Sequence, residues 1–140
     1  MNFAYTAGRV SSVTQSGTDG TTRTVSYTYN GTGRLATSTD ADGHTTTYSY
    51  DGANRVSQVL TARGVKVTLT YDGSGRVATV SRYDDAGAAQ TWTLAYESAT
   101  STRVTDANGA SWWYGTDTAK RPSTGGRSWA PRSATRRGSR

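Results

Sequence analysis

The sequence predicts an all-β fold in which repeated β-hairpins follow one another as an antiparallel meander. Three observations predict it. The 140 residues include 26 Thr, nine Tyr and four Trp, residue types that favour strands over helices. Turn-forming residues recur at regular intervals, and apolar residues alternate with polar ones between the turns. No segment has a sustained 3.6-residue period, so no helix is expected.

One hairpin is expected in each repeated unit of the sequence. Every unit contains a short motif of Tyr, Asp or Asn, Gly and Arg. The motif occupies residues 29–34, 50–55 and 71–76, at intervals of 21 residues. Further copies begin at Tyr96 and, in partial form, near Tyr5, which gives about five repeats. A repeat of this length with strand-like patterning indicates stacked units that bury a continuous surface together.

A second turn is expected near the middle of each unit. Asp or Asn followed by Gly is a strong signal for a type I′ hairpin turn, because both central residues of that turn need positive φ. Two turns in 21 residues leave two strands of about six to eight residues. The second turns are predicted at Asp19-Gly20, Asp42-Gly43, Arg63-Gly64, Ala86-Gly87 and Asn108-Gly109.

The strand that precedes each motif has one apolar face. Val65, Val67, Leu69 and Tyr71 alternate with polar residues, and neighbouring units would align such residues into aromatic ladders. The strand that follows the motif fits less well. Its apolar residues, such as those at positions 77 and 80, are three apart. A bulge, a strong twist or burial on both faces would reconcile this spacing.

Charge divides the chain into two parts. Residues 1–118, the predicted meander, carry nine Lys or Arg and ten Asp or Glu, whereas residues 119–140 carry seven Lys or Arg and no acid. Because like charges with little to bury do not order a chain, we expect this basic tail to be disordered. Nucleic acid is not an expected partner, since only the tail is basic. No apolar run is long enough to span a membrane, and no signal peptide is recognised.

The repeated unit, Tyr-Asp-x-x-Gly-Arg-[Leu/Val] followed by a Gly turn and Tyr-x-Tyr-Asp, resembles the RHS or YD repeat over roughly residues 5–118. Asn30 and Glu97 depart from its Asp, and Asn54 from its Gly. The resemblance implies a segment of a large, extracellular or cell-surface protein, bacterial or teneurin-like. In such proteins the repeats form a β-shell, which in bacterial members commonly encloses a C-terminal toxin domain. The implied partners are adjacent repeats or that domain.

The motif residues are expected to be structural. Each Asp would cap its own turn or pair with the Arg four residues on. A carboxylate pair for glycoside hydrolysis is the functional alternative, but identical residues at every turn indicate architecture. The predicted structural residues are Tyr29, Gly33, Arg34, Tyr50, Asp51, Arg55, Tyr71, Asp72, Gly75, Arg76 and Tyr96.

The sequence predicts no enzyme, no cofactor and no metal site. The chain has no Cys and one His, His44, which lacks the partners of a catalytic triad. Asp40 with Asp42, and Asp84 with Asp85, could be considered for Ca²⁺, but no EF-hand pattern accompanies them. The predicted function is a structural segment of an encapsulating shell, associated with a secreted toxin. The alternative is a carbohydrate-binding surface module, with the adjacent Trp112 and Trp113 stacking on a glycan.

Overall fold

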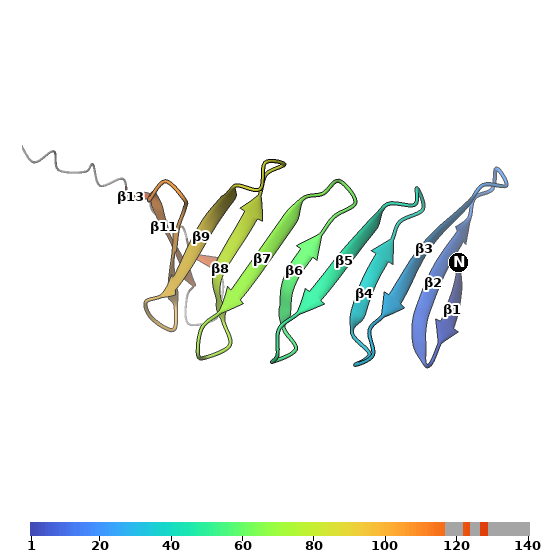
Figure 1. Cartoon of the computed structure of the whole chain (residues 1–140), viewed down its shortest axis with the longest axis horizontal. Helices are drawn as coiled ribbons and strands as arrows, with labels where there is room; N and C mark the ends of the chain where they lie inside the picture. The colour runs from blue at the N-terminus through green and yellow to red at the C-terminus, as the bar shows by residue number, and fades with distance from the viewer. Residues whose placement is uncertain (117–121, 124–126, 129–140) are drawn as a thin grey trace, which may run out of the picture. The chain divides into compact units, whose positions relative to one another are not determined.

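A computed structural model describes residues 1–116, 122–123 and 127–128, and this part of the chain is entirely β (Figure 1). The all-β fold class is therefore confirmed. The described residues contain no helix that could cross a membrane. The chain divides into two compact units, residues 1–90 and 91–140, which are considered separately.

The first unit is an antiparallel sheet in which strands lie side by side in sequence order (Figure 1). Each strand from β1 to β7 pairs with the next, as expected for a meander of hairpins. The strands are β1 (Asn2–Thr6), β2 (Arg9–Ser16), β3 (Thr22–Tyr29), β4 (Leu35–Thr39), β5 (Thr45–Tyr50), β6 (Val56–Leu60), β7 (Lys66–Tyr71) and β8 (Val77–Tyr83).

The turns differ from the predicted type I′. At Asp42-Gly43, residues 40–44 form a five-residue turn closed by Asp40 N–H donating to the His44 carbonyl at 3.0 Å. Only Gly43 of this turn has positive φ, at 84°, whereas a type I′ turn needs two such residues. The same pattern closes the motif turns. Positive φ at two consecutive residues occurs instead at Ala7-Gly8, the two-residue turn between β1 and β2.

A β-bulge resolves the spacing of the apolar residues after the motif. Tyr71 pairs with Val77 but Thr70 pairs with Thr79, so Ala78 is an extra residue. The extra residue shifts the alternation by one, and Val77 and Val80 then share a face. Equivalent register shifts adjoin Tyr5, Tyr29 and Tyr50.

The two faces of the first unit differ in chemistry. On one face, Tyr71 lies opposite Val77 and Leu69 lies opposite Val80. No described residue is buried, so this apolar face remains half-exposed and the sheet has no closed core. The opposite face carries cross-strand hydroxyl pairs: Thr28 with Thr37 at 2.6 Å, Thr39 with Thr45 at 2.8 Å and Thr70 with Thr79 at 2.6 Å.

The second unit contains most of β9 (Ala89–Tyr96), which pairs antiparallel with β10 (Ser101–Thr105), and β10 pairs with β11 (Ser111–Thr116). Two short strands, β12 (Pro122–Ser123) and β13 (Arg127–Ser128), both pair with β11. Both lie in the predicted basic tail. The remaining tail residues, and the predicted boundary at residue 118, lie outside the described part.

Candidate functional site

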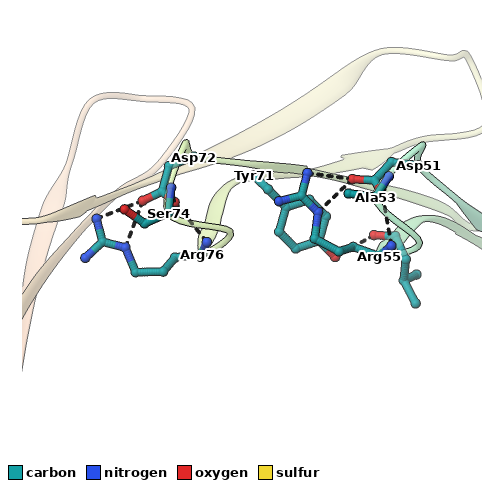
Figure 2. A network of polar contacts seen from close by, with 8 residues as sticks. Asp51, Ala53, Arg55, Tyr71, Asp72, Ser74 and Arg76 are labelled. Carbon is teal, nitrogen blue, oxygen red and sulfur yellow. Dashed lines mark hydrogen bonds and ion pairs between the residues drawn. The ribbon is translucent and has the colours of Figure 1, made fainter.

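The motif turn at residues 51–55 is held by both oxygens of one carboxylate. Asp51 Oδ1 accepts the backbone N–H groups of Ala53 and Arg55, each at 2.9 Å. Its Oδ2 accepts Nε of Arg55 at 2.8 Å and lies 2.7 Å from Nη2, which makes a forked ion pair (Figure 2). The carboxylate therefore caps the turn and also holds the arginine. The sequence predicted these two roles as alternatives.

The turn at residues 72–76 repeats this arrangement. Asp72 Oδ1 accepts the N–H groups of Ser74 and Arg76 at 2.9 Å, and Oδ2 accepts Nε of Arg76 at 2.8 Å (Figure 2). The N–H of the arginine lowers the pKa of Asp51 and of Asp72 below the ordinary value of 3.8, and the guanidinium lowers it further. Both groups are therefore carboxylates held by internal donors.

Each motif tyrosine reaches back to the preceding motif. The Tyr71 hydroxyl donates to the Val56 carbonyl at 2.6 Å, and the Arg55 guanidinium lies 4.2 Å from the centre of the Tyr71 ring. Figure 2 shows this ring beside Arg55. One tyrosine is thus bound at its ring and at its hydroxyl by two successive residues of the previous copy.

The same pair of contacts occurs at the two earlier tyrosines. Tyr50 donates to the Leu35 carbonyl at 2.9 Å, and Arg34 lies 5.9 Å from its ring centre. Tyr29 donates to the Val10 carbonyl at 2.8 Å, and Arg9 lies 5.7 Å from its ring centre. Sequence reasoning did not identify these carbonyls or Arg9, although an Arg-[Leu/Val] step before each Tyr was the available signal.

The fourth residue of the motif turn needs a left-handed backbone. Gly33, Asn54 and Gly75 have φ of 77°, 67° and 79°. Glycine is favoured there because it has no Cβ to strain, and Asn tolerates the conformation better than most residues. At Gly33 there is a second reason: an added Cβ would collide with the Arg9 guanidinium.

Residues 29–66 match the RHS Repeat family. Over this segment the chain is similar to an RHS repeat. The matched segment holds the turns at 30–34 and 51–55, and the copies outside it are assigned by the residues they share with it. No curated protein matched the chain.

Several solved structures are similar to the chain at low sequence identity. One is a mutant Tc holotoxin pore from Photorhabdus luminescens, with 16% identity and a TM-score of 0.37. Another is the TcdB2-TccC3-Cdc42 complex, with 15% identity and a TM-score of 0.38. The matches cover 72% and 73% of this chain but 7% of each matched chain, so this chain spans a small part of their length.

The copy of the motif that begins at Tyr96 is irregular. Glu97 N–H donates to the Ser101 carbonyl, so Ser101 occupies the place of the motif arginine, and Arg103 lies two residues further along in β10. Arg103 therefore does not occupy the position that Arg55 has in its turn. Glu97 still binds this arginine, with Oε1 accepting Nε of Arg103 at 2.8 Å.

The two candidate glycan-stacking residues lie on β11 of this irregular copy. Strand alternation places Trp112 and Trp113 on opposite faces, with Trp112 opposite Val104 and Trp113 opposite Arg103. Both are half-buried, and the Trp113 ring N–H donates to Oε2 of Glu97 at 3.0 Å. Glycan stacking by these residues stays a prediction.

Among the described residues, one cluster could offer three metal ligands. Asp40, Asp42 and His44 have ligand atoms within 4.8 Å of one another, and all three are exposed. However, Oδ1 of Asp40 accepts the N–H groups of Asp42 and His44, and Oδ2 lies 3.4 Å from His44 Nδ1. These contacts repeat the Asp51 turn with a histidine in place of the arginine, which accounts for the cluster structurally.

Proposed function

We propose that this chain is a structural segment of an RHS-repeat shell in a secreted or surface-displayed bacterial protein associated with a toxin, and that it is not an enzyme. The observation that carries the proposal is the threefold recurrence of one contact between successive units, at Tyr29, Tyr50 and Tyr71. A catalytic site is one special place in a fold, whereas a contact repeated at each step is typical of repeat architecture.

The polar groups of the motif also support a scaffold role. The carboxylates of Asp51 and Asp72 each accept two backbone N–H groups and bind an arginine, which lowers their pKa. A general acid near neutral pH needs the opposite shift. These groups therefore fit the stabilisation of turns better than proton transfer.

The half-exposed apolar face supports enclosure of another protein surface. Tyr27, Tyr48 and Leu69 lie in strands of this face, yet none is buried. A contiguous apolar surface on a soluble protein usually marks an interaction site. We propose that adjacent repeats or an enclosed domain cover this face in the assembled protein.

The test compares the two faces of one strand. We expect the dilute chain to bind the apolar-surface dye ANS and to self-associate with rising concentration. Leu69→Asp should reduce both effects by placing a charge on the apolar face. The matched control is Thr68→Asp, on the opposite face of β7, which should change neither. Circular dichroism would check folding, and Tyr48→Ser replaces Leu69→Asp if the latter does not fold.

Two results would contradict the proposal. One is cooperative thermal unfolding of a dilute monomer that binds no ANS, because such a chain needs no further covering. The other is specific binding on a glycan array that Trp113→Ala abolishes, which would establish the carbohydrate-binding alternative instead.

A further inference from the structure

Strand β1 has an open edge and exposed aromatic side chains. Within the described part of the chain it pairs with β2 and no other strand, and all five of its residues are exposed. Phe3 and Tyr5 are 54% and 64% exposed, more than any tyrosine in β3, β5 or β7, which are all half-buried. Unpaired backbone groups along such an edge can accept a further strand.

Tyr5 occupies the position that the motif tyrosines occupy in their own hairpins. It pairs with Val10, beside a register shift between Ala4 and Tyr5. Tyr71 likewise pairs with Val77, beside a shift between Thr70 and Tyr71. Tyr5 therefore has the same cross-strand pairing and adjoining register shift within its own hairpin as Tyr71 has.

The opposite side of Tyr5 lacks what the other copies have. Tyr29, Tyr50 and Tyr71 each have an arginine over the ring and donate their hydroxyl to the carbonyl of the residue that follows that arginine. In each case the carbonyl belongs to the first or second residue of the preceding strand, and the arginine is the residue just before it. No described residue provides either contact to Tyr5.

We propose that the β1 edge is a docking site for a strand of another RHS-type hairpin that begins with Arg-Val or Arg-Leu. Its arginine covers the Tyr5 ring, and the carbonyl of the next residue accepts the Tyr5 hydroxyl. This inference rests on the proposed scaffold function and names the partner surface through which the array is extended. Main-chain pairing along the edge provides affinity, and the Arg–Tyr contact provides register and specificity.

The experiment uses the full chain and a hairpin taken from its own sequence. A cyclised peptide of residues 45–60 carries the Arg55-Val56 step where the turn meets β6, and it is labelled with a fluorophore for anisotropy titration. The peptide should bind, with its affinity falling about tenfold on Tyr5→Ala and severalfold on Tyr5→Phe, because ring and hydroxyl each contribute. The peptide variant Arg55→Gln should bind the wild-type chain more weakly than the wild-type peptide does. For the Tyr5→Ala chain, the two peptides should bind equally.

Controls and outcomes separate the alternatives. Ala4→Ser, next to Tyr5 on the opposite face, should leave binding unchanged. A photo-crosslinking residue at position 5 should capture the peptide. Binding that is insensitive to Arg55→Gln, or no capture at position 5, would overturn the inference. So would capture of a second copy of the chain through its own β1, which contains no arginine. The ANS experiment concerns the sheet face and not its edge, so the two proposals can fail separately.

Discussion

The turns at 30–34 and 51–55 have the same backbone hydrogen bonds but differ in their first residue, Asn30 against Asp51, as well as in their third and fourth residues. Both are closed by the same backbone bonds, Asn30 N–H to Arg34 and Asp51 N–H to Arg55, at 2.8 Å. In both, Oδ1 of the first residue accepts the N–H of the arginine at 2.9 Å. The backbone of the turn thus needs one oxygen, which Asn and Asp supply equally.

The second oxygen makes the difference. Arg55 is bound by Oδ2 of Asp51 and lies 4.2 Å from the centre of the next tyrosine ring. Arg34 lacks such a partner in Asn30, and donates instead to Thr32 Oγ1 at 2.8 Å. Its guanidinium lies 5.9 Å from the ring centre. In the Asp51 turn, one carboxylate oxygen thus holds the turn while the other binds the arginine that contacts the next unit.

The largest effect should come from removing the ring that receives the arginine. Tyr71→Ala removes the ring contact with Arg55 and the hydroxyl bond to the Val56 carbonyl. Because the side chain is half-buried, we expect a loss of about 2–3 kcal/mol in local stability. Hydrogen exchange of β6 and β7 amides would measure it. Tyr50→Ala should cost less, since Arg34 lies further from its ring.

A matched variant separates the two contacts of Tyr71. Tyr71→Phe keeps the ring under Arg55 and removes the hydroxyl, so it should lose about 1 kcal/mol. Equal losses for Tyr71→Ala and Tyr50→Ala would show that the closer arginine adds nothing.

A smaller effect is expected at the fourth turn residue. Gly33→Ala places a Cβ at φ of 77° and against the Arg9 guanidinium, whereas Gly75→Ala meets only Arg55 Nη1, at 3.7 Å. The left-handed backbone costs about 1–2 kcal/mol in both variants. Gly33→Ala should cost more, and exchange of the β3–β4 amides would show whether it does. The matched variant Asn54→Gly should be neutral or slightly stabilising.

The sequence predicted the meander because the apolar alternation before Tyr71 and the 21-residue interval both report on strands directly. It failed on turn type, because Asp42-Gly43 satisfies both a type I′ turn and a five-residue turn that needs only one positive φ. The contact between units was missed for a different reason. Its acceptors are backbone carbonyls of Val10, Leu35 and Val56, and every residue has a carbonyl.

The length of the turn explains why Arg103 is out of register in the copy that begins at Tyr96. In the sequence, Arg103 can be aligned with Arg55 because each arginine precedes a valine. The five-residue turn at Glu97 nevertheless closes on Ser101, and a turn of fixed length determines which residue follows it. The longer side chain of Glu97 then reaches an arginine two residues further along, a compensation that spacing alone does not reveal.

Acidic pH should destabilise the turns at Asp51 and Asp72 but not the turn at Asn30. The pKa of Asp51 and Asp72 is lower when folded than the ordinary value of 3.8, because N–H groups and arginines bind the charged form. Their contribution to stability is therefore fully present above pH about 3.8 and is lost as pH falls through the lower folded pKa. The turn at Asn30 has no such group and provides the internal control.

NMR chemical shifts and exchange of the turn amides would follow this titration. The amides of Ala53 and Arg55 should lose protection in strongly acidic solution, while those of Thr32 and Arg34 should keep theirs. Simultaneous loss at both turns would indicate global acid unfolding and would contradict a local role of the carboxylates.

The smallest effects should come from exchanging the two residues that define the comparison. Asp51→Asn keeps the turn acceptor and removes the oxygen that binds Arg55, so this turn should come to resemble the one at Asn30. Asn30→Asp should do the reverse and draw Arg34 over the Tyr50 ring. Since these groups are partly exposed, we expect changes of a few-fold in exchange rates of the adjoining amides, and smaller ones at high salt. Upfield ring-current shifts of arginine side-chain protons should appear at Arg34 in Asn30→Asp and diminish at Arg55 in Asp51→Asn. If neither arginine moves, its distance from the ring is set by strand geometry and the second oxygen has no positioning role.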